Sequence, residues 1–176
     1  MKQAFLFISL GVILCGCNTT HIIKPNLESR YLSDEELPKL TATKPLALKN
    51  ASLNTVEMQL CSYDRYYLVF GKLFDFTNSA LGTVKNALER KSVVIDEKAD
   101  KILELSVYEA DCMPETWTFK TVIGLRIRTG DGVEMVCKGD AHIFNAFATA
   151  VGFEQAINDS VRQMLNDKYI INYIEK

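Results

Sequence analysis

The sequence predicts an α+β fold, in which a mixed, mainly antiparallel sheet carries two amphipathic helices on one face. Three segments within residues 101–143 are rich in alternating apolar residues and are separated by turn residues, as in an antiparallel meander. Residues 79–91 and 148–165 instead repeat their apolar residues at helical spacing. Helices on one face of a sheet bury both apolar surfaces. The predicted order is β-α-β-β-β-β-α.

The first residues predict an export signal. Lys2 precedes an uncharged apolar segment at residues 4–14. This segment is shorter than the roughly 20 residues that a membrane-spanning helix needs, and it has the length of a signal-peptide apolar region. We therefore expect residues 1–16 to be a lipoprotein signal peptide that is removed.

Leu14, at the end of this segment, begins the run Leu14-Cys15-Gly16-Cys17, which resembles the lipobox of bacterial lipoprotein precursors. This motif implies a diacylglycerol on the sulfur of Cys17 and a further acyl chain, such as palmitate, on its freed amine. Two or three chains hold a protein firmly, whereas one chain binds a membrane reversibly. The polar residues 18–20 favour the outer membrane, with the domain facing the periplasm. The alternative is a plain secretory signal in which Cys17 is incidental.

The composition is that of one globular domain. Cleavage would leave 160 of the 176 residues and would remove Lys2, so that the net charge changes from −2 to −3. With 48% hydrophobic and 24% charged residues, the chain is not of the disordered class. The charge is not basic enough to indicate a nucleic-acid partner.

Two regions are expected in the mature chain. Residues 17–50 contain Pro25, Pro38 and Pro45 and no sustained apolar period, which predicts a lipidated N-terminus followed by a flexible tether. Residues 51–176 are expected to form the single α+β domain.

The first half of this domain should contain a strand and a helix. A partly alternating strand is predicted at residues 52–60, and the aromatic segment at residues 61–70 either extends it or forms a separate strand. Thr77 and Asn78 are N-cap residue types before the helix at residues 79–91.

A short strand at residues 92–96 and the meander follow. Its strands are expected at residues 101–111, 117–129 and 133–143, and Asp131-Gly132 is a strong hairpin-turn pair. The last long helix is predicted to bury a stripe formed by Ala148, Val151, Ile157, Val161, Met164 and Leu165. Residues 169–174 are read as a last turn or two of helix, with a short strand as the alternative.

Several short sequence segments together resemble those of the YajG-type lipoproteins and, more distantly, those of the LptE-like proteins and the TolB amino-terminal module. The resemblance covers about residues 52–170 and implies a fold and a cell-envelope setting, without any catalytic residue. The segments that carry it are the helix at residues 78–90, Val93-Val94-Ile95, the Ala99-Asp100 pair before a strand, and residues 152–167.

Three cysteines remain beyond the lipidated one. In an oxidising compartment, Cys61, Cys112 and Cys137 most simply make one bridge and leave one thiol. The resemblance implies that the first strand lies parallel to the strand at residues 102–110, which would bring Cys61 and Cys112 together as a disulfide. The alternative is that all three are buried thiols.

The residues do not predict an enzyme, a metal site or a cofactor. His21 and His142 are the only histidines, and no zinc-ligand spacing accompanies them. His142 is the only plausible base, and no nucleophile elbow is present. An acidic series around one strand is interpreted as solvated strand ends: Asp96, Asp100, Glu104, Glu109 and Asp111.

Aromatic residues supply the remaining candidate surface, because they are enriched in binding hot spots. Tyr63, Tyr66, Tyr67 and Phe70 are the candidate partner-binding residues. Other aromatic residues close to them or in the meander are Phe74, Phe76, Trp117 and Phe119.

Three functions are compatible with these observations. The leading one is a membrane-anchored, non-enzymatic accessory or binding module with an envelope protein partner. The alternative is a lipid or glycolipid transport component of LptE-like type, which would need a groove or exposed apolar patch near residues 63–76. A cell-wall enzyme would need a cleft with convergent ionisable groups.

Overall fold

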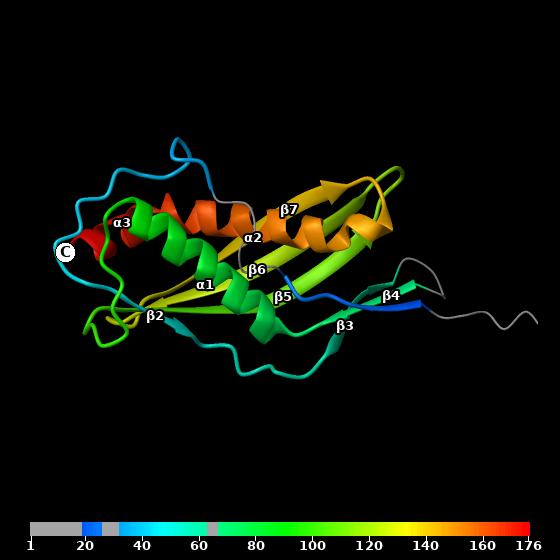
Figure 1. The fold of residues 1–176 in the computed structure, drawn as a ribbon, viewed down its shortest axis with the longest axis horizontal. Coiled ribbons are helices and arrows are strands. Elements are labelled where there is room, and N and C mark those ends of the chain that lie inside the picture. The colour runs from blue at the N-terminus through cyan, green and yellow to red at the C-terminus, as the bar shows by residue number, and fades with distance from the viewer. Residues whose placement is uncertain (1–18, 26–31, 63–66) are drawn as a thin grey trace, which may run out of the picture.

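The computed structural model describes residues 19–25, 32–62 and 67–176 (Figure 1). The described residues form a four-stranded sheet of order β2-β5-β6-β7 and a three-stranded sheet of order β1-β4-β3. Two long helices cover one face of the larger sheet, so the predicted α+β class is confirmed. The elements are β1 (Thr19–Ile22), β2 (Ala47–Asn50), β3 (Met58–Ser62), β4 (Tyr67–Gly71), α1 (Leu73–Arg90), β5 (Ile102–Pro114), β6 (Phe119–Thr129), β7 (Glu134–Ile143), η1 (Ala146–Ala148), α2 (Thr149–Leu165) and α3 (Lys168–Glu175).

The meander β5-β6-β7 is the predicted one. Its strands pair antiparallel, and the turn uses Gly132 with a φ of +88°, which glycine adopts without steric cost. Leu105, Leu125 and Ile127 are fully buried on the helix-covered face. The other face carries cross-strand ion pairs such as Arg126 to Glu134, at 3.2 Å. One face of the sheet is therefore dry and the other solvated.

Helix α1 begins six residues earlier than predicted, at Leu73. The two expected caps make other bonds: the Thr77 hydroxyl donates to the Leu73 carbonyl and accepts from the Val107 N–H, each at 2.8 Å, and the Asn78 side chain accepts from Asn50. Side chains that suit a helix N-cap thus serve here to attach the first turns of α1 to the sheet.

Helix α2 packs beside α1 on β6 and β7, and the rings of Phe76 and Phe153 meet edge to face, 5.1 Å apart. The predicted stripe is wrong at its start, because Val151 is 41% exposed and Phe153 is fully buried. Residues 168–175 form helix α3 and not a strand. Among the described helices, none has both the length and the apolar character needed to cross a bilayer.

The expected tether at residues 17–50 is largely part of the domain. β1 pairs parallel with β4, and β2 pairs parallel with β5, from Ala47 beside Ile102 to Asn50 beside Leu105. Leu32, Leu37 and Leu46 are also buried. These apolar residues are isolated between prolines and show no period, so only their packing partners reveal that they belong to the core.

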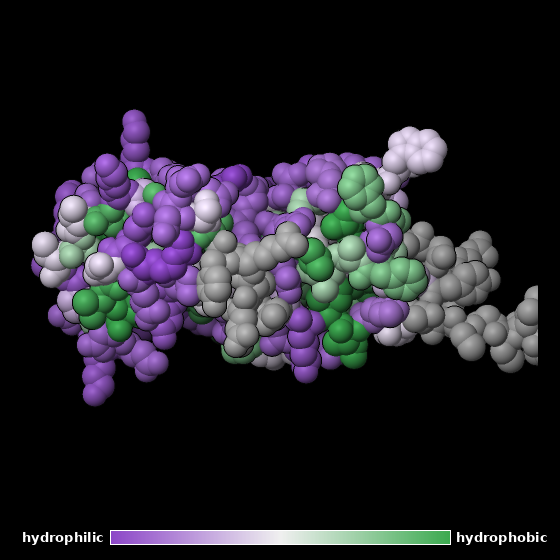
Figure 2. All heavy atoms as spheres, turned by 45° about the horizontal axis from the view of Figure 1, so that its top comes forward, coloured by the Kyte–Doolittle hydropathy of each residue, from purple (hydrophilic) through white to green (hydrophobic). Residues whose placement is uncertain are grey.

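Two expected strands are also corrected. Residues 52–57 are not a strand, because Leu53 is 96% and Val56 is 72% exposed, and β3 begins only at Met58. β3 and β4 form an antiparallel pair, so the aromatic segment supplies a separate strand. At residues 92–96 only Ile95 makes a bridge, to Leu46. Figure 2 shows hydrophobic side chains at the surface near the end where β1, β4 and the start of α2 lie.

Candidate functional site

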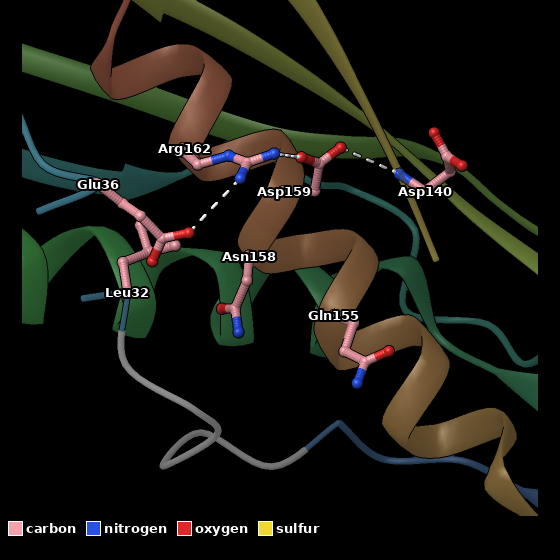
Figure 3. A pocket seen from close by; sticks show the side chains of 7 residues that line it. All are labelled: Leu32, Glu36, Asp140, Gln155, Asn158, Asp159 and Arg162. Atoms are coloured by element: carbon pink, nitrogen blue, oxygen red, sulfur yellow. Dashed lines mark hydrogen bonds and ion pairs between the residues drawn. The ribbon is translucent and has the colours of Figure 1, made fainter. Parts of the chain in front are cut away.

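A shallow hollow of about 180 Å³ lies between the segment at residues 32–37 and helix α2 (Figure 3). Arg162 lies between Asp159, which it contacts closely, and Glu36, whose carboxylate is 3.5 Å away. Hydrogen bonds from the backbone and hydroxyl of Ser33 lower the pKa of Glu36. The Asn166 side chain donates to the Glu36 carbonyl. These groups bind one another, so the hollow attaches the N-terminal segment to α2.

A second hollow, of about 360 Å³, lies at the end of the molecule formed by α3 and the start of β5. Burial and the nearby Lys44 lower the pKa of Lys101, whose ammonium group donates to the Ile174 carbonyl. Three lysines and one aspartate contribute charges to this hollow, which therefore has positive charge. The residues that line it are Lys44, Lys101, Asp131, Tyr169, Asn172, Tyr173 and Lys176.

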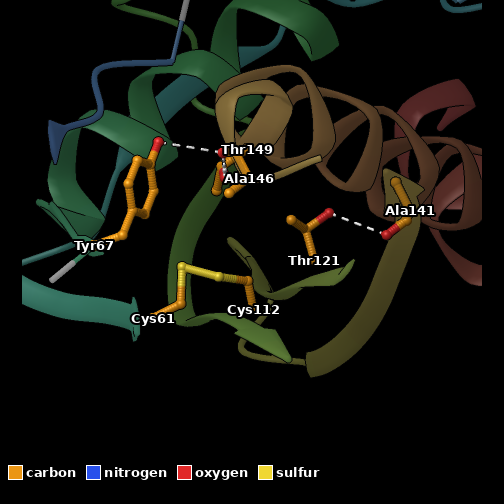
Figure 4. Close-up of a disulfide and its surroundings, with 7 residues drawn as sticks. All are labelled: Cys61, Tyr67, Cys112, Thr121, Ala141, Ala146 and Thr149. Carbon is orange, nitrogen blue, oxygen red and sulfur yellow. Dashed lines mark hydrogen bonds between the residues drawn. A yellow bond between two sulfur atoms is a disulfide. The ribbon is translucent and has the colours of Figure 1, made fainter. Parts of the chain in front are cut away.

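A disulfide joins Cys61 of β3 to Cys112 of β5, with Cα atoms 5.2 Å apart (Figure 4). The expected parallel pairing of their strands is wrong, because β5 pairs with β2 on that side. The bridge instead connects the small sheet to the large one. Cys137 is a buried free thiol, and burial raises its pKa, so it is not an activated nucleophile.

Tyr67 holds the small sheet to the start of α2. Its ring stacks on His21 of β1, with centroids 4.5 Å apart, and meets Phe147 edge to face at 5.7 Å. Its hydroxyl donates to the Ala146 carbonyl at 3.3 Å (Figure 4), and burial raises the pKa of Tyr67. A hollow of about 250 Å³ adjoins this contact, lined by His21, Ile22, Ile23, Lys24, Tyr67, Phe147, Thr149 and Ala150.

Three exposed aromatic side chains lie in the loops at this end of the molecule (Figure 1), and one of them, Phe147, belongs to this contact. Trp117, in the hairpin between β5 and β6, is 86% exposed; Phe144 and Phe147, between β7 and α2, are 84% and 82% exposed. The two loops are neighbours, because Phe119 and Ile143 pair at the ends of their strands. Single exposed apolar residues are ordinary, but a group of large ones marks a contact surface. We call Trp117, Phe144 and Phe147 the aromatic end.

Polar contacts support the loop that presents Trp117. The Glu115 N–H donates to the Thr118 carbonyl at 2.8 Å, and the Thr118 hydroxyl donates to the Glu115 carboxylate at 2.5 Å. The same carboxylate lies 2.9 Å from Nδ1 of His142. Hydrogen bonding from Thr118, and then from His142, lowers the pKa of Glu115. The hairpin is thereby tied to β7 beneath the aromatic end.

Of the four predicted partner-binding residues, the structure describes Tyr67 and Phe70. Tyr63 and Tyr66 lie outside the described residues, Tyr67 is engaged as above, and Phe70 is half-buried. Phe76 belongs to the core. Phe144 and Phe147 were not predicted as surface residues. The sequence feature that could have identified them is a pair of phenylalanines between the end of an alternating strand and the start of a helix.

Many ionisable groups of the described residues form ion pairs at the surface. In residues 19–25, 32–62 and 67–176, no group of three His, Cys, Asp or Glu side chains is placed so that it could hold a metal ion. Within the acidic series, Glu109 pairs with Lys138 at 2.7 Å and Glu104 with Arg128 at 3.9 Å. The chain matches no family model and no curated protein.

Proposed function

We propose that this chain is a lipoprotein anchored through Cys17 to the outer membrane, where its periplasm-facing domain acts as a non-enzymatic accessory or binding module of the cell envelope. The observation that carries the proposal is the lipobox ending at Cys17, two residues before strand β1. A lipid on that residue would attach the folded domain directly to a leaflet.

Two structural features support this proposal. The Cys61–Cys112 disulfide suits the oxidising periplasm that an exported chain reaches. Many ionisable side chains of the described residues form ion pairs with one another at the surface, which suits a binding module better than an enzyme. The resemblance to the YajG-type lipoproteins agrees with the same setting. The lysine-lined hollow lies at the end away from β1, where an acidic surface of an envelope protein partner would reach it.

Intact-mass measurement on protein extracted from cell membranes tests the anchor. We expect a mature chain that begins at Cys17 and carries the mass of two or three acyl chains, recovered with the outer membrane. The Cys17→Ala variant should lose the acyl mass and leave the membrane fraction. A wild-type chain with an unmodified Cys17 would refute the proposal.

Lipid or glycolipid transport is the alternative, and the aromatic end with its adjoining hollow is the feature that favours it. The hollow is about 250 Å³, below the roughly 300–1,000 Å³ of sites that enclose drug-sized ligands. A multi-chain lipid is larger still, so a carrier role would require the site to open. Purified protein that retains one lipid per chain, other than its own anchor, would favour transport over the binding module.

A further inference from the structure

The proposed anchor and the fold together restrict where the domain lies. Only Asn18 separates Cys17 from Thr19, the first residue of β1. At about 3.6 Å for each residue, two residues span at most about 7 Å, whereas a fully extended tether from residue 17 to 50 would span about 120 Å. A lipid on Cys17 therefore holds the β1 end of the domain close to the bilayer.

The aromatic end lies at this same end of the molecule. Thr19 pairs with Tyr67, and the ring of Tyr67 contacts Phe147. β2 pairs with the start of β5, and the hairpin with Trp117 follows the other end of β5. Figure 1 shows this hairpin at the end of the molecule where β1 and β4 lie. The most exposed aromatic side chains thus lie at the end of the molecule where β1 begins (Figure 1), and Phe147 is joined to it through Tyr67.

From this juxtaposition, and resting on the lipid anchor proposed above, we propose that Trp117, Phe144 and Phe147 insert into the interfacial region of the anchoring bilayer. Tryptophan is enriched at membrane interfaces, and apolar side chains of surface-bound proteins enter about 5–10 Å. The covalent anchor makes this contact intramolecular, so a weak affinity is enough to keep it occupied.

The contact is apolar and not electrostatic. Glu115 lies beside Trp117, but its carboxylate is bound by Thr118 and His142, and Lys120 is paired with Asp140 at 3.3 Å. Among the described residues at this end, the two positive charges of Lys24 and Lys120 are matched by Glu115 and Asp140, which leaves no excess of positive charge for anionic lipid. Insertion should therefore be nearly the same in neutral and anionic vesicles and should change little with salt.

Trp117 is the only tryptophan in the chain, so its fluorescence reports the contact directly. The lipidated full-length mature protein is reconstituted into phosphatidylcholine vesicles, with and without brominated acyl chains. We expect a blue-shifted emission that the brominated lipid reduces about twofold, since the indole would lie at the interfacial depth of about 5–10 Å. The Phe144→Ser/Phe147→Ser variant should lose most of this quenching, because it keeps the anchor and removes two exposed side chains.

A matched control places the reporter at the other end. Tyr169 in α3 is 36% exposed, and Trp117→Phe combined with Tyr169→Trp should give emission that brominated lipid leaves unchanged. Equal quenching at both positions would overturn the proposal, because the domain would then have no preferred end. Unquenched Trp117 in a protein that floats with the vesicles would also overturn it and leave the anchor intact. Absence of acyl mass on Cys17 would instead remove the proposed function on which it rests.

Discussion

Removing the disulfide between Cys61 and Cys112 should lower the free energy of unfolding by about 4 kcal/mol. The two cysteines are 51 residues apart. In the chain-entropy account, cross-linking a loop of this length removes entropy from the unfolded chain worth about 4 kcal/mol at 25 °C. For a domain of this size, the loss corresponds to a fall in Tm of roughly 8–16 °C.

Urea unfolding checks this value on three samples: the oxidised protein, the same protein with a reductant, and the Cys61→Ala/Cys112→Ala variant. Alanine is used because serine would bury an unpaired hydroxyl at two sites that are only 5% and 4% exposed. The reduced protein and the variant should both be about 4 kcal/mol less stable than the oxidised protein.

The control is Cys137→Ala, which should keep the full response to reductant. The reasoning would be refuted if the double variant stayed within about 1 kcal/mol of the oxidised protein, well below the usual 2–4 kcal/mol. A reductant that still shifted the midpoint of the double variant would equally show that another bridge exists.

Three further changes test the packing. A Cβ on Gly139 would lie 2.1 Å from the Ala156 carbonyl oxygen, so Gly139→Ala should displace α2 and cost about 3 kcal/mol in urea unfolding, the upper part of the overpacking range. Thr77→Val leaves the buried N–H of Val107 without its acceptor and should cost about 1–3 kcal/mol, whereas Thr77→Ser should keep most of the stability. The pKa of Glu36 is lowered below its usual 4.5, so its stabilising contribution is present above that value and is lost as the pH falls through the folded-state pKa. The unfolding midpoint of Glu36→Gln should therefore fall less than that of the wild type between pH 7 and about pH 3; an equal fall would show that other carboxylates account for the acid sensitivity.

The elements that were predicted well have local signals. The three meander strands are each ten or more residues long, with buried and exposed residues alternating most regularly along β7, and Asp131-Gly132 is a turn pair whose backbone preference does not depend on distant residues. The predicted start of helix α2, at residue 148, is within one residue of the observed start, because its apolar residues repeat at helical spacing over many residues. Thr77 and Asn78, by contrast, have a local preference for N-caps that tertiary hydrogen bonds to Val107 and Asn50 override.

Which aromatic side chains are exposed could not be predicted from the sequence. Tyr67 and Phe70 were identified as aromatic residues in a suitable segment, but composition does not say which way a ring faces. Tyr67 packs between His21 and Phe147, and the exposed residues are Phe144, Phe147 and Trp117. Exposure depends on which chain segments cover a residue, and these segments are far apart in sequence.

Short-range patterns were sufficient to predict the meander and the two long helices, because each depends on neighbours within a few residues; the proposed export signal and lipobox at Cys17 rest on patterns of the same kind. The segment at residues 17–50 required the folded chain: its four-residue strands and isolated leucines have no period of their own and become core only against β4, β5 and α2. Because β1 pairs with β4, the folded domain begins at Thr19, two residues after Cys17. It therefore determines which end of the protein an anchored chain would present to the membrane.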